Sequence, residues 1–270
     1  MPITKVGDLN VEYYVEGEGP PLLMIMGMAG QASSWGEPFL ERLRPHFTTI
    51  RFSNRGTGSS DKPTDALSIR VMADDAAGLL TELGIEKAHV LGISMGGMIA
   101  QELVLNYPEK VQGLVLGCTT CGPARGIATP AETVARFGGI VNLPIEERIR
   151  QFWNIMITPD FMTSGKRFLE DVIETGMETR TPMETIGRQW GAALAFDSYD
   201  RLPQIKAPTL VIHGDRDMLV PAGNADVLHQ QIAGSQKRIV PGVAHMFFWE
   251  KAGESATAVA EFLAKVPVGA

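Results

Sequence analysis

One stretch decides the fold of this chain: His89-Val90-Leu91-Gly92-Ile93-Ser94-Met95-Gly96-Gly97-Met98-Ile99-Ala100. A short apolar run ends at Ser94, with Gly92 two positions before the serine and Gly96 two positions after it, and a helical pattern begins at once. A serine in the pattern G-x-S-x-G, at a sharp turn from strand to helix, is typical of an exposed nucleophile held in a strained conformation. Glycines at both flanks are expected where strand and helix pass too closely for side chains.

Length and charge exclude several classes of protein. A chain of 270 residues, 44% of them hydrophobic, can bury one large α/β core and still carry an insertion. The formal net charge of −7 argues against nucleic acid or an anionic membrane as a partner. No apolar run is long enough to span a bilayer, and the first residues lack the apolar core of a secretory signal, so we expect a cytoplasmic protein.

Strand patterns and helical patterns alternate up to residue 121. The expected strands lie within residues 3–16 (a pair) and at 22–26, 48–52, 89–93 and 111–117. The expected helices are residues 69–83, residues 95–107 and one that begins at Ser33 or Ser34 and runs to about Arg44. This alternation predicts a parallel sheet with right-handed crossovers.

The rhythm changes between residues 122 and 202, where only helical patterns occur. They cover residues 131–137, 145–155, 166–174 and 183–195. The alternation then resumes with strands at 209–213 and 237–240 and helices at 221–232 and 252–264. We therefore expect a core domain of residues 1–121 and 203–270, with a helical cap of residues 122–202 inserted in it.

Four motifs along the chain carry a resemblance to a known family. They are Asn54-Arg55-Gly56-Thr57-Gly58-Ser59, Gly92-Ile93-Ser94-Met95-Gly96-Gly97, Pro208-Thr209-Leu210-Val211-Ile212-His213-Gly214-Asp215-Arg216-Asp217 and Gly242-Val243-Ala244-His245. From about Val11 to Phe262 the chain resembles the α/β-hydrolase superfamily, and within it the branch of esterases and enol-lactonase-like serine hydrolases. The resemblance implies a mostly parallel eight-stranded sheet with flanking helices and a helical cap after the sixth strand.

The resemblance also implies a catalytic triad. Ser94 would be the nucleophile, Asp217 the acid and His245 the base, in the order Ser, Asp, His that is typical of this fold. The chemistry of the residues agrees, because a serine hydroxyl needs a neighbouring base and the imidazole needs a carboxylate that fixes its tautomer. Asp215 lies in the same turn, but the family's acid stands three residues after the strand-ending glycine, here Gly214, which favours Asp217. Asp215 is expected to brace the turn.

The oxyanion of the reaction needs two aimed N–H donors. Met95 is expected to supply one, as the residue after the nucleophile, and Met28 the other, as the residue after Gly27. Two departures from the family pattern fall in this region. Met26 stands before Gly27 where the family usually has histidine, and Asn54 stands where the family usually has aspartate.

Apolar side chains adjoin the turns that carry these motifs. Gly27, Met218 and Met246 are expected to contact the substrate, and Phe247-Phe248-Trp249 is expected either to extend an apolar pocket or to pack the last helix. Arg55 is interpreted mainly as an arginine that ties loops together.

Neither a metal nor a cofactor is expected. Cys118 and Cys121 form a lone C-x-x-C without the second pair of ligands that zinc would need, so two reduced, partly buried thiols are the favoured interpretation. The histidines other than His245 are interpreted as hydrogen-bonded structural residues; they are His46, His89, His213 and His229.

Three functions remain open. The first hypothesis is a serine hydrolase that cleaves carboxylic esters, with a small-molecule ester as its partner. The second is a lactonase or a carbon–carbon bond hydrolase with the same triad. The third is a non-catalytic small-molecule receptor on the same fold, because fold alone does not determine function. The sequence is compatible with a homodimer.

Overall fold

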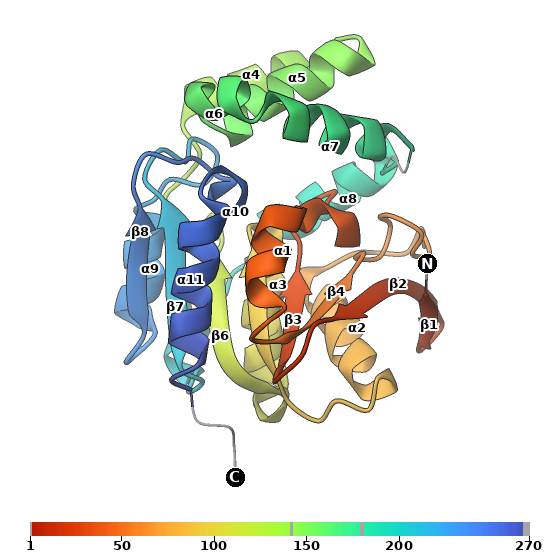
Figure 1. Ribbon diagram of the computed structural model, residues 1–270, viewed down its shortest axis with the longest axis vertical. Helices are drawn as coiled ribbons and strands as arrows, with labels where there is room; N and C mark the ends of the chain where they lie inside the picture. The colour runs from red at the N-terminus through yellow and green to blue at the C-terminus, as the bar shows by residue number, and fades with distance from the viewer. Residues whose placement is uncertain (1, 141–142, 179–180, 267–270) are drawn as a thin grey trace.

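The computed structural model describes residues 2–140, 143–178 and 181–266, in which a central sheet lies between two layers of helices (Figure 1). The remaining residues of the expected domains, 1, 141–142, 179–180 and 267–270, lie outside the described part. None of the described helices is both long enough and apolar enough to cross a bilayer.

The sheet has eight strands in spatial order β1-β2-β4-β3-β5-β6-β7-β8. The strands are β1 (Ile3–Val6), β2 (Leu9–Glu16), β3 (Pro21–Ile25), β4 (Thr48–Phe52), β5 (Ala88–Ile93), β6 (Val111–Gly117), β7 (Thr209–Gly214) and β8 (Gln236–Val240). The pairs β1–β2 and β2–β4 are antiparallel, and every other neighbouring pair is parallel. The expected mostly parallel eight-stranded sheet is confirmed.

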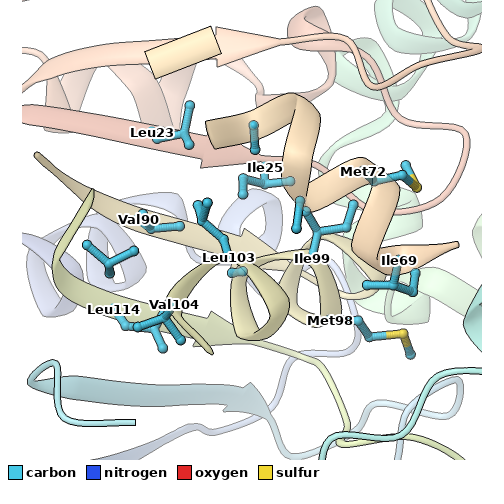
Figure 2. Packing of buried hydrophobic residues seen from close by; sticks show 14 of the residues in the cluster. Leu23, Ile25, Ile69, Met72, Val90, Met98, Ile99, Leu103, Val104 and Leu114 are labelled. Atoms are coloured by element: carbon cyan, nitrogen blue, oxygen red, sulfur yellow. The ribbon is translucent and has the colours of Figure 1, made fainter. Parts of the chain in front are cut away.

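Side chains alternate between the two faces of the sheet, as the period of a strand requires. In β3, Leu23 and Ile25 join the cluster that also includes side chains of α2, α3 and α9, and Figure 2 shows part of it. Leu22 and Met24 join the opposite cluster with α1 and α11. These helices are α1 (Glu37–Leu43), α2 (Ile69–Glu82), α3 (Met95–Asn106), α9 (Asn224–Gln231) and α11 (Ala252–Leu263). Both faces are covered, which explains why the central strands are apolar throughout.

The turn from β5 to α3 has no room for side chains beside Ser94. A Cβ added to Gly96 would lie 2.1 Å from the carbonyl oxygen of Ile25, and one added to Gly92 would lie 2.3 Å from the carbonyl oxygen of Gly96. The expected steric reason for these two glycines is thus confirmed.

The helices between β6 and β7 are α4 (Ala131–Ile140), α5 (Ile145–Met156), α6 (Pro159–Ser164), α7 (Lys166–Glu178) and α8 (Met183–Leu194). Helices α4 to α7 form a layer beyond one end of the sheet, and α8 lies between that layer and the core (Figure 1). Helix α8 buries Thr185, Gln189, Ala192 and Ala193, which recur at helical spacing and turn one face of α8 inward.

One expected helix is wrong and some short helices were not expected. The segment predicted to run as one helix from Ser33 or Ser34 to Arg44 is divided into η1 (Ala32–Trp35) and α1. Gly36 separates them with a φ of +77°, a left-handed conformation that no helix accommodates. The sequence also did not indicate α6, α10 (Phe247–Glu250), η2 (Pro108–Lys110) or η3 (Tyr199–Gln204).

Replacing Gly96 by alanine should destabilise the protein, because the new methyl group would meet main-chain atoms rather than a mobile side chain. We expect Gly96→Ala to lower the free energy of unfolding by at least about 2 kcal/mol. Gly187→Ala in α8 is the matched control: a Cβ there meets nothing within 4 Å, so stability should rise by up to about 1 kcal/mol. Urea unfolding of both variants measures the difference, and equal stabilities would contradict the packing argument.

Candidate active site

Ser94 forms the turn between β5 and α3. Its backbone has φ +57° and ψ −123°, an uncommon conformation that costs a residue with a side chain roughly 1–3 kcal/mol. Two hydrogen bonds hold the turn: the Ser94 N–H donates to Gly117 O at 2.9 Å, and the Thr119 hydroxyl donates to Ser94 O at 2.6 Å. The strained turn expected from G-x-S-x-G is therefore present, and the amino end of α3 begins at the next residue.

Asp217 and His245 meet at the same edge of the sheet. Asp217 follows β7, His245 lies in the loop between β8 and α10, and His245 Nδ1 is 2.7 Å from Asp217 Oδ2. Burial would raise the pKa of Asp217, but the charge of the His245 ring and the hydrogen bonds from His245 and His213 outweigh it and hold that pKa below its usual range. Burial would lower the pKa of His245, but the Asp217 carboxylate outweighs it and raises that pKa well above 6.5. The pair can hold and release a proton.

His213 is a partner of the acid that the sequence analysis did not foresee. Its Nε2 lies 3.1 Å from Asp217 Oδ2 and 2.8 Å from Val220 O, and the side chain is fully buried. Asp217 Oδ1 accepts two further bonds, from the N–H groups of Leu219 and Val220 at 2.9 Å each. The interpretation of His213 as a hydrogen-bonded residue is confirmed, but its partner is the carboxylate that holds His245.

Asp215 faces outward and has a different environment. Its Oδ1 accepts a hydrogen bond from Gly242 N–H at 2.6 Å, which joins the turn after β7 to the loop that carries His245. The side chain is exposed, whereas the Asp217 side chain is fully buried. Of the two aspartates in this turn, the structure brings Asp217 to the imidazole and leaves Asp215 as a brace.

The other ring nitrogen of His245, Nε2, is buried and has no hydrogen-bond partner among the described residues. Cys118, directly after β6, interacts both with the His245 side chain and with the backbone of Ser94, so Ser94 and His245 converge on one buried thiol.

Cys118 also bears on the question of a metal. Donor atoms of Cys118, Asp217 and His245 lie within 4.8 Å of one another. However, burial raises the pKa of the Cys118 thiol, which keeps it protonated and a weak ligand. The oxygens of Asp217 and Nδ1 of His245 are already engaged in hydrogen bonds. The arrangement fits a hydrogen-bonded acid–base pair better than a metal centre.

The turn after β3 lies against the serine. A Cβ added to Gly27 would be 3.0 Å from Cβ and 3.5 Å from Oγ of Ser94, so Gly27 borders the Ser94 side chain. Met95 N–H is the first of α3 and has no acceptor within that helix. In the described part of the chain, Met28 N–H likewise has no acceptor. Both N–H groups expected to serve the oxyanion therefore lack a backbone acceptor among the described residues, and their role stays a prediction.

Core side chains fix the two ends of this turn. The Asn54 amide donates to Met26 O at 2.9 Å, a bond that an ionised aspartate, which can only accept, would not make. Ser53 Oγ accepts from Ala32 N–H at 3.0 Å, and Arg51 donates to Ala32 O at 3.0 Å. The bond between Asn54 and Met26 depends on the departure at 54 but not on the one at 26, because its acceptor is the main-chain carbonyl of Met26.

The expected apolar wall is only partly formed by the residues named for it. Met246 is buried, but Met218 is 36% exposed. Phe248 and Trp249 pack against Trp35 and against Phe168 of the cap, around a cavity of about 130 Å³. The residues that line it do not include Ser94, Asp217 or His245. Of the two interpretations of 247–249, packing between the last helices and the cap is the one that the contacts show.

The arginines near the motifs are engaged away from the serine. Arg55 makes a two-pronged ion pair with Asp75 of α2. Its role is therefore structural, as expected, but the pair ties its loop to a helix rather than to another loop. The guanidinium of Arg125 lies 5.3 Å from the centre of the Tyr199 ring. Arg188 of α8 lines a narrow crevice with Arg55, and no triad residue lines it.

A serine at a strained turn from strand to helix and a buried histidine–aspartate pair, all at the carboxyl edge of a parallel sheet, are the features of a hydrolase of the α/β class. The family model described as the alpha/beta hydrolase fold matches residues 20–252, so this chain belongs to that family and is a hydrolase.

Relatives of this chain differ in the bonds they cleave. A protein of Azorhizobium caulinodans, provisionally named a carbamate hydrolase, is 32% identical over 248 residues, which are 92% of this chain and 92% of that protein. The 2-hydroxy-6-oxononadienedioate/2-hydroxy-6-oxononatrienedioate hydrolase of Paraburkholderia phymatum is 28% identical over 95% of this chain and 91% of that protein. The crystal structure of the enol-lactonase from Burkholderia xenovorans LB400 has a TM-score of 0.86 and 25% identity, and the match covers 98% of this chain and 100% of that one.

The two aspartates can be separated by the pH dependence of activity. His245 can accept a proton only when neutral, and Asp217 raises its pKa, so kcat/KM should fall as the pH drops through a value above 6.5. Asp217→Asn removes the charge that raises this pKa, so the acidic limb should move to lower pH while kcat falls by about 10⁴-fold.

Asp215→Asn is the matched control, since asparagine still offers Gly242 an acceptor. Its kcat should stay within a few-fold of the wild type and its acidic limb should not move. Profiles of kcat/KM from pH 5 to 9 test both statements. A displaced limb in Asp215→Asn and an unchanged one in Asp217→Asn would reverse the roles of the two residues.

Proposed function

We propose that this chain cleaves carboxylic esters through an acyl-enzyme on Ser94, with His245 as the base and Asp217 as the acid that orients it. The observation that carries the proposal is the buried His245–Asp217 pair at 2.7 Å, at the edge of the sheet that carries Ser94. Within the described residues, no hydrogen bond to the second ring nitrogen, Nε2, is seen. The names of two relatives, a carbamate hydrolase and an enol-lactonase, support transfer of an acyl group to water.

The reaction would proceed in two halves. His245 Nε2 removes the proton from the Ser94 hydroxyl as its oxygen attacks the ester carbonyl carbon, and the oxyanion that forms is stabilised by the N–H groups of Met28 and Met95. The carbon–oxygen bond to the alcohol then breaks, and His245 returns the proton to the leaving alkoxide. A water molecule repeats the sequence on the acyl-enzyme and releases the carboxylic acid and the free serine.

The substrate is proposed to be a small uncharged ester. Arg55 is paired with Asp75, and Arg125 lies over Tyr199, so neither guanidinium is offered to a substrate carboxylate. Burying an unpaired carboxylate beside the serine would be costly. The net charge of −7 argues further against nucleic acid or an anionic membrane as a partner. The cytoplasmic location and a homodimer stay predictions.

Lactone or carbon–carbon bond hydrolysis with the same triad is the second candidate. It is favoured by the likeness to the enol-lactonase and to the 2-hydroxy-6-oxononadienedioate hydrolase. A lactone is a cyclic ester and would need no change in the mechanism. A dienedioate carries two carboxylates, for which the paired Arg55 is poorly suited.

The first test concerns the nucleophile. Ser94→Ala should lower kcat for a chromogenic ester such as p-nitrophenyl butyrate by about 10⁴-fold or more, and His245→Ala by a similar factor, because triad members act as a unit. A fluorophosphonate should label the wild type at Ser94 and leave Ser94→Ala unlabelled, as peptide mass spectrometry would show. Near wild-type turnover by folded Ser94→Ala would refute the serine mechanism.

The second test concerns the acyl group. We expect kcat/KM to rise about fourfold for each methylene of the acyl chain that is buried against apolar side chains, since each contributes about 0.8 kcal/mol. Once the acyl chain is too long for the space under the cap, kcat/KM should fall. Acetate, butyrate, hexanoate, decanoate and hemisuccinate esters of one phenol give the comparison. A preference for the hemisuccinate would instead indicate an anionic substrate, and Arg188→Gln would then be the variant that abolishes that preference.

A further inference from the structure

The turn that carries Met28 is bonded to the cap region as well as to the core. Gln189 of α8 is 0% exposed, and its Oε1 accepts a hydrogen bond from Ala29 N–H at 2.9 Å. Thr181, just before α8, donates its hydroxyl to Ala29 O at 3.1 Å. Both polar groups of the Ala29 backbone are therefore held by side chains that lie more than 150 residues away in the sequence.

Ala29 needs such support because its backbone is strained. Its φ is +58°, in the left-handed region that residues with a side chain rarely occupy. A conformation of this kind persists only where its surroundings over-determine it. The bond to Gln189 also engages the N–H of Ala29. Of the two consecutive N–H groups in this turn, that of Met28 has no backbone acceptor among the described residues.

Helix α8 is itself anchored to the core at a second place. The Gln189 amide donates to Arg55 O at 3.4 Å, and Arg55 is held by its ion pair with Asp75. One turn earlier in α8, Thr185 packs so closely on Gly56 that an added Cβ would lie 2.3 Å from its methyl carbon. The Gln189 side chain thus links two loops of the core, at Ala29 and at Arg55, and the helix that carries it is packed against the core.

We propose that Gln189 is a positioning residue that aims the Met28 N–H at the oxyanion, so that α8 of the cap completes the catalytic site. This inference rests on the proposed ester hydrolysis. Gln189 does not touch the reacting atoms; it acts through Ala29. A donor displaced from the oxyanion harms the transition state more than the bound ester, so the loss should appear in kcat rather than in KM.

The test is Gln189→Met, which keeps the size of the side chain but removes both hydrogen-bonding groups. We expect kcat for p-nitrophenyl butyrate to fall roughly 10- to 100-fold, with KM within about threefold of the wild type. A trifluoromethyl ketone, which Ser94 converts to a bound oxyanion, should lose affinity by the same factor as kcat/KM. Because Gln189 is deeply buried, Thr181→Val serves as a second variant, with the same pattern and a smaller loss.

The matched control is Gln151→Met in α5, the same substitution in the cap, where the hydrogen bond that the amide makes among the described residues goes to Glu147 within its own helix. Its kinetics should equal those of the wild type. The role of Gln189 is overturned if the wild type is active and both Gln189→Met and Thr181→Val keep wild-type kcat and ketone affinity, or if losses appear only in KM and thermal stability. A wild type that neither hydrolyses the ester nor binds the ketone overturns the ester-hydrolase proposal itself.

Discussion

The close approach of α3 to β3 is the constraint on which the site depends. Main chain meets main chain at Gly96 and Ile25, with no space for a side chain between them. The chain can pass from β5 into α3 at this separation only through a tight turn, and Ser94 takes up the left-handed conformation that results. The strain persists because the strands and the helix on both sides are buried and closely packed. The same approach brings Gly27 beside Ser94, so one packing constraint sets both the serine and the turn that faces it.

A second constraint is electrostatic. A carboxylate as buried as that of Asp217 would be unstable without hydrogen bonds to its charged form. Here two backbone N–H groups bond one oxygen, and the rings of His213 and His245 approach the other. The loop after β7 surrounds this carboxylate with its N–H groups, and the loop after β8 contacts it through His245. As a result, Nδ1 of His245 is hydrogen-bonded to Asp217, and Nε2 lies on the opposite side of the ring from that bond.

The cap contacts the core in two different ways. Its outer helices meet the core through aromatic rings, as Phe168 of α7 does with Trp249. Helix α8 instead makes polar bonds to the turns at Ala29 and Arg55. Apolar contacts of the first kind are non-directional and tolerate sliding, whereas hydrogen bonds require particular atoms at particular distances. The contacts of α8 are therefore the more specific of the two kinds.

The sequence by itself determined the layers and most of the elements, because apolar runs and helical periodicity are local properties. Through the resemblance of its motifs to the α/β-hydrolase superfamily it also indicated Ser94, Asp217 and His245, and the shared carboxyl edge of a parallel sheet is where such residues can meet. The break at Gly36 was missed because its left-handed conformation depends on packing rather than on pattern.

Tertiary structure alone decided the supporting residues. Asn54, His213 and Gln189 carry no local signal for their roles. The sequence around an amide or imidazole side chain does not indicate whether that side chain faces water or another loop. Gln189 and Ala29 are 160 positions apart, and only folding places the amide against that N–H. Local patterns set which segments become strands and helices. The partners of a buried polar group are set by whichever chain segments the fold brings within hydrogen-bonding distance.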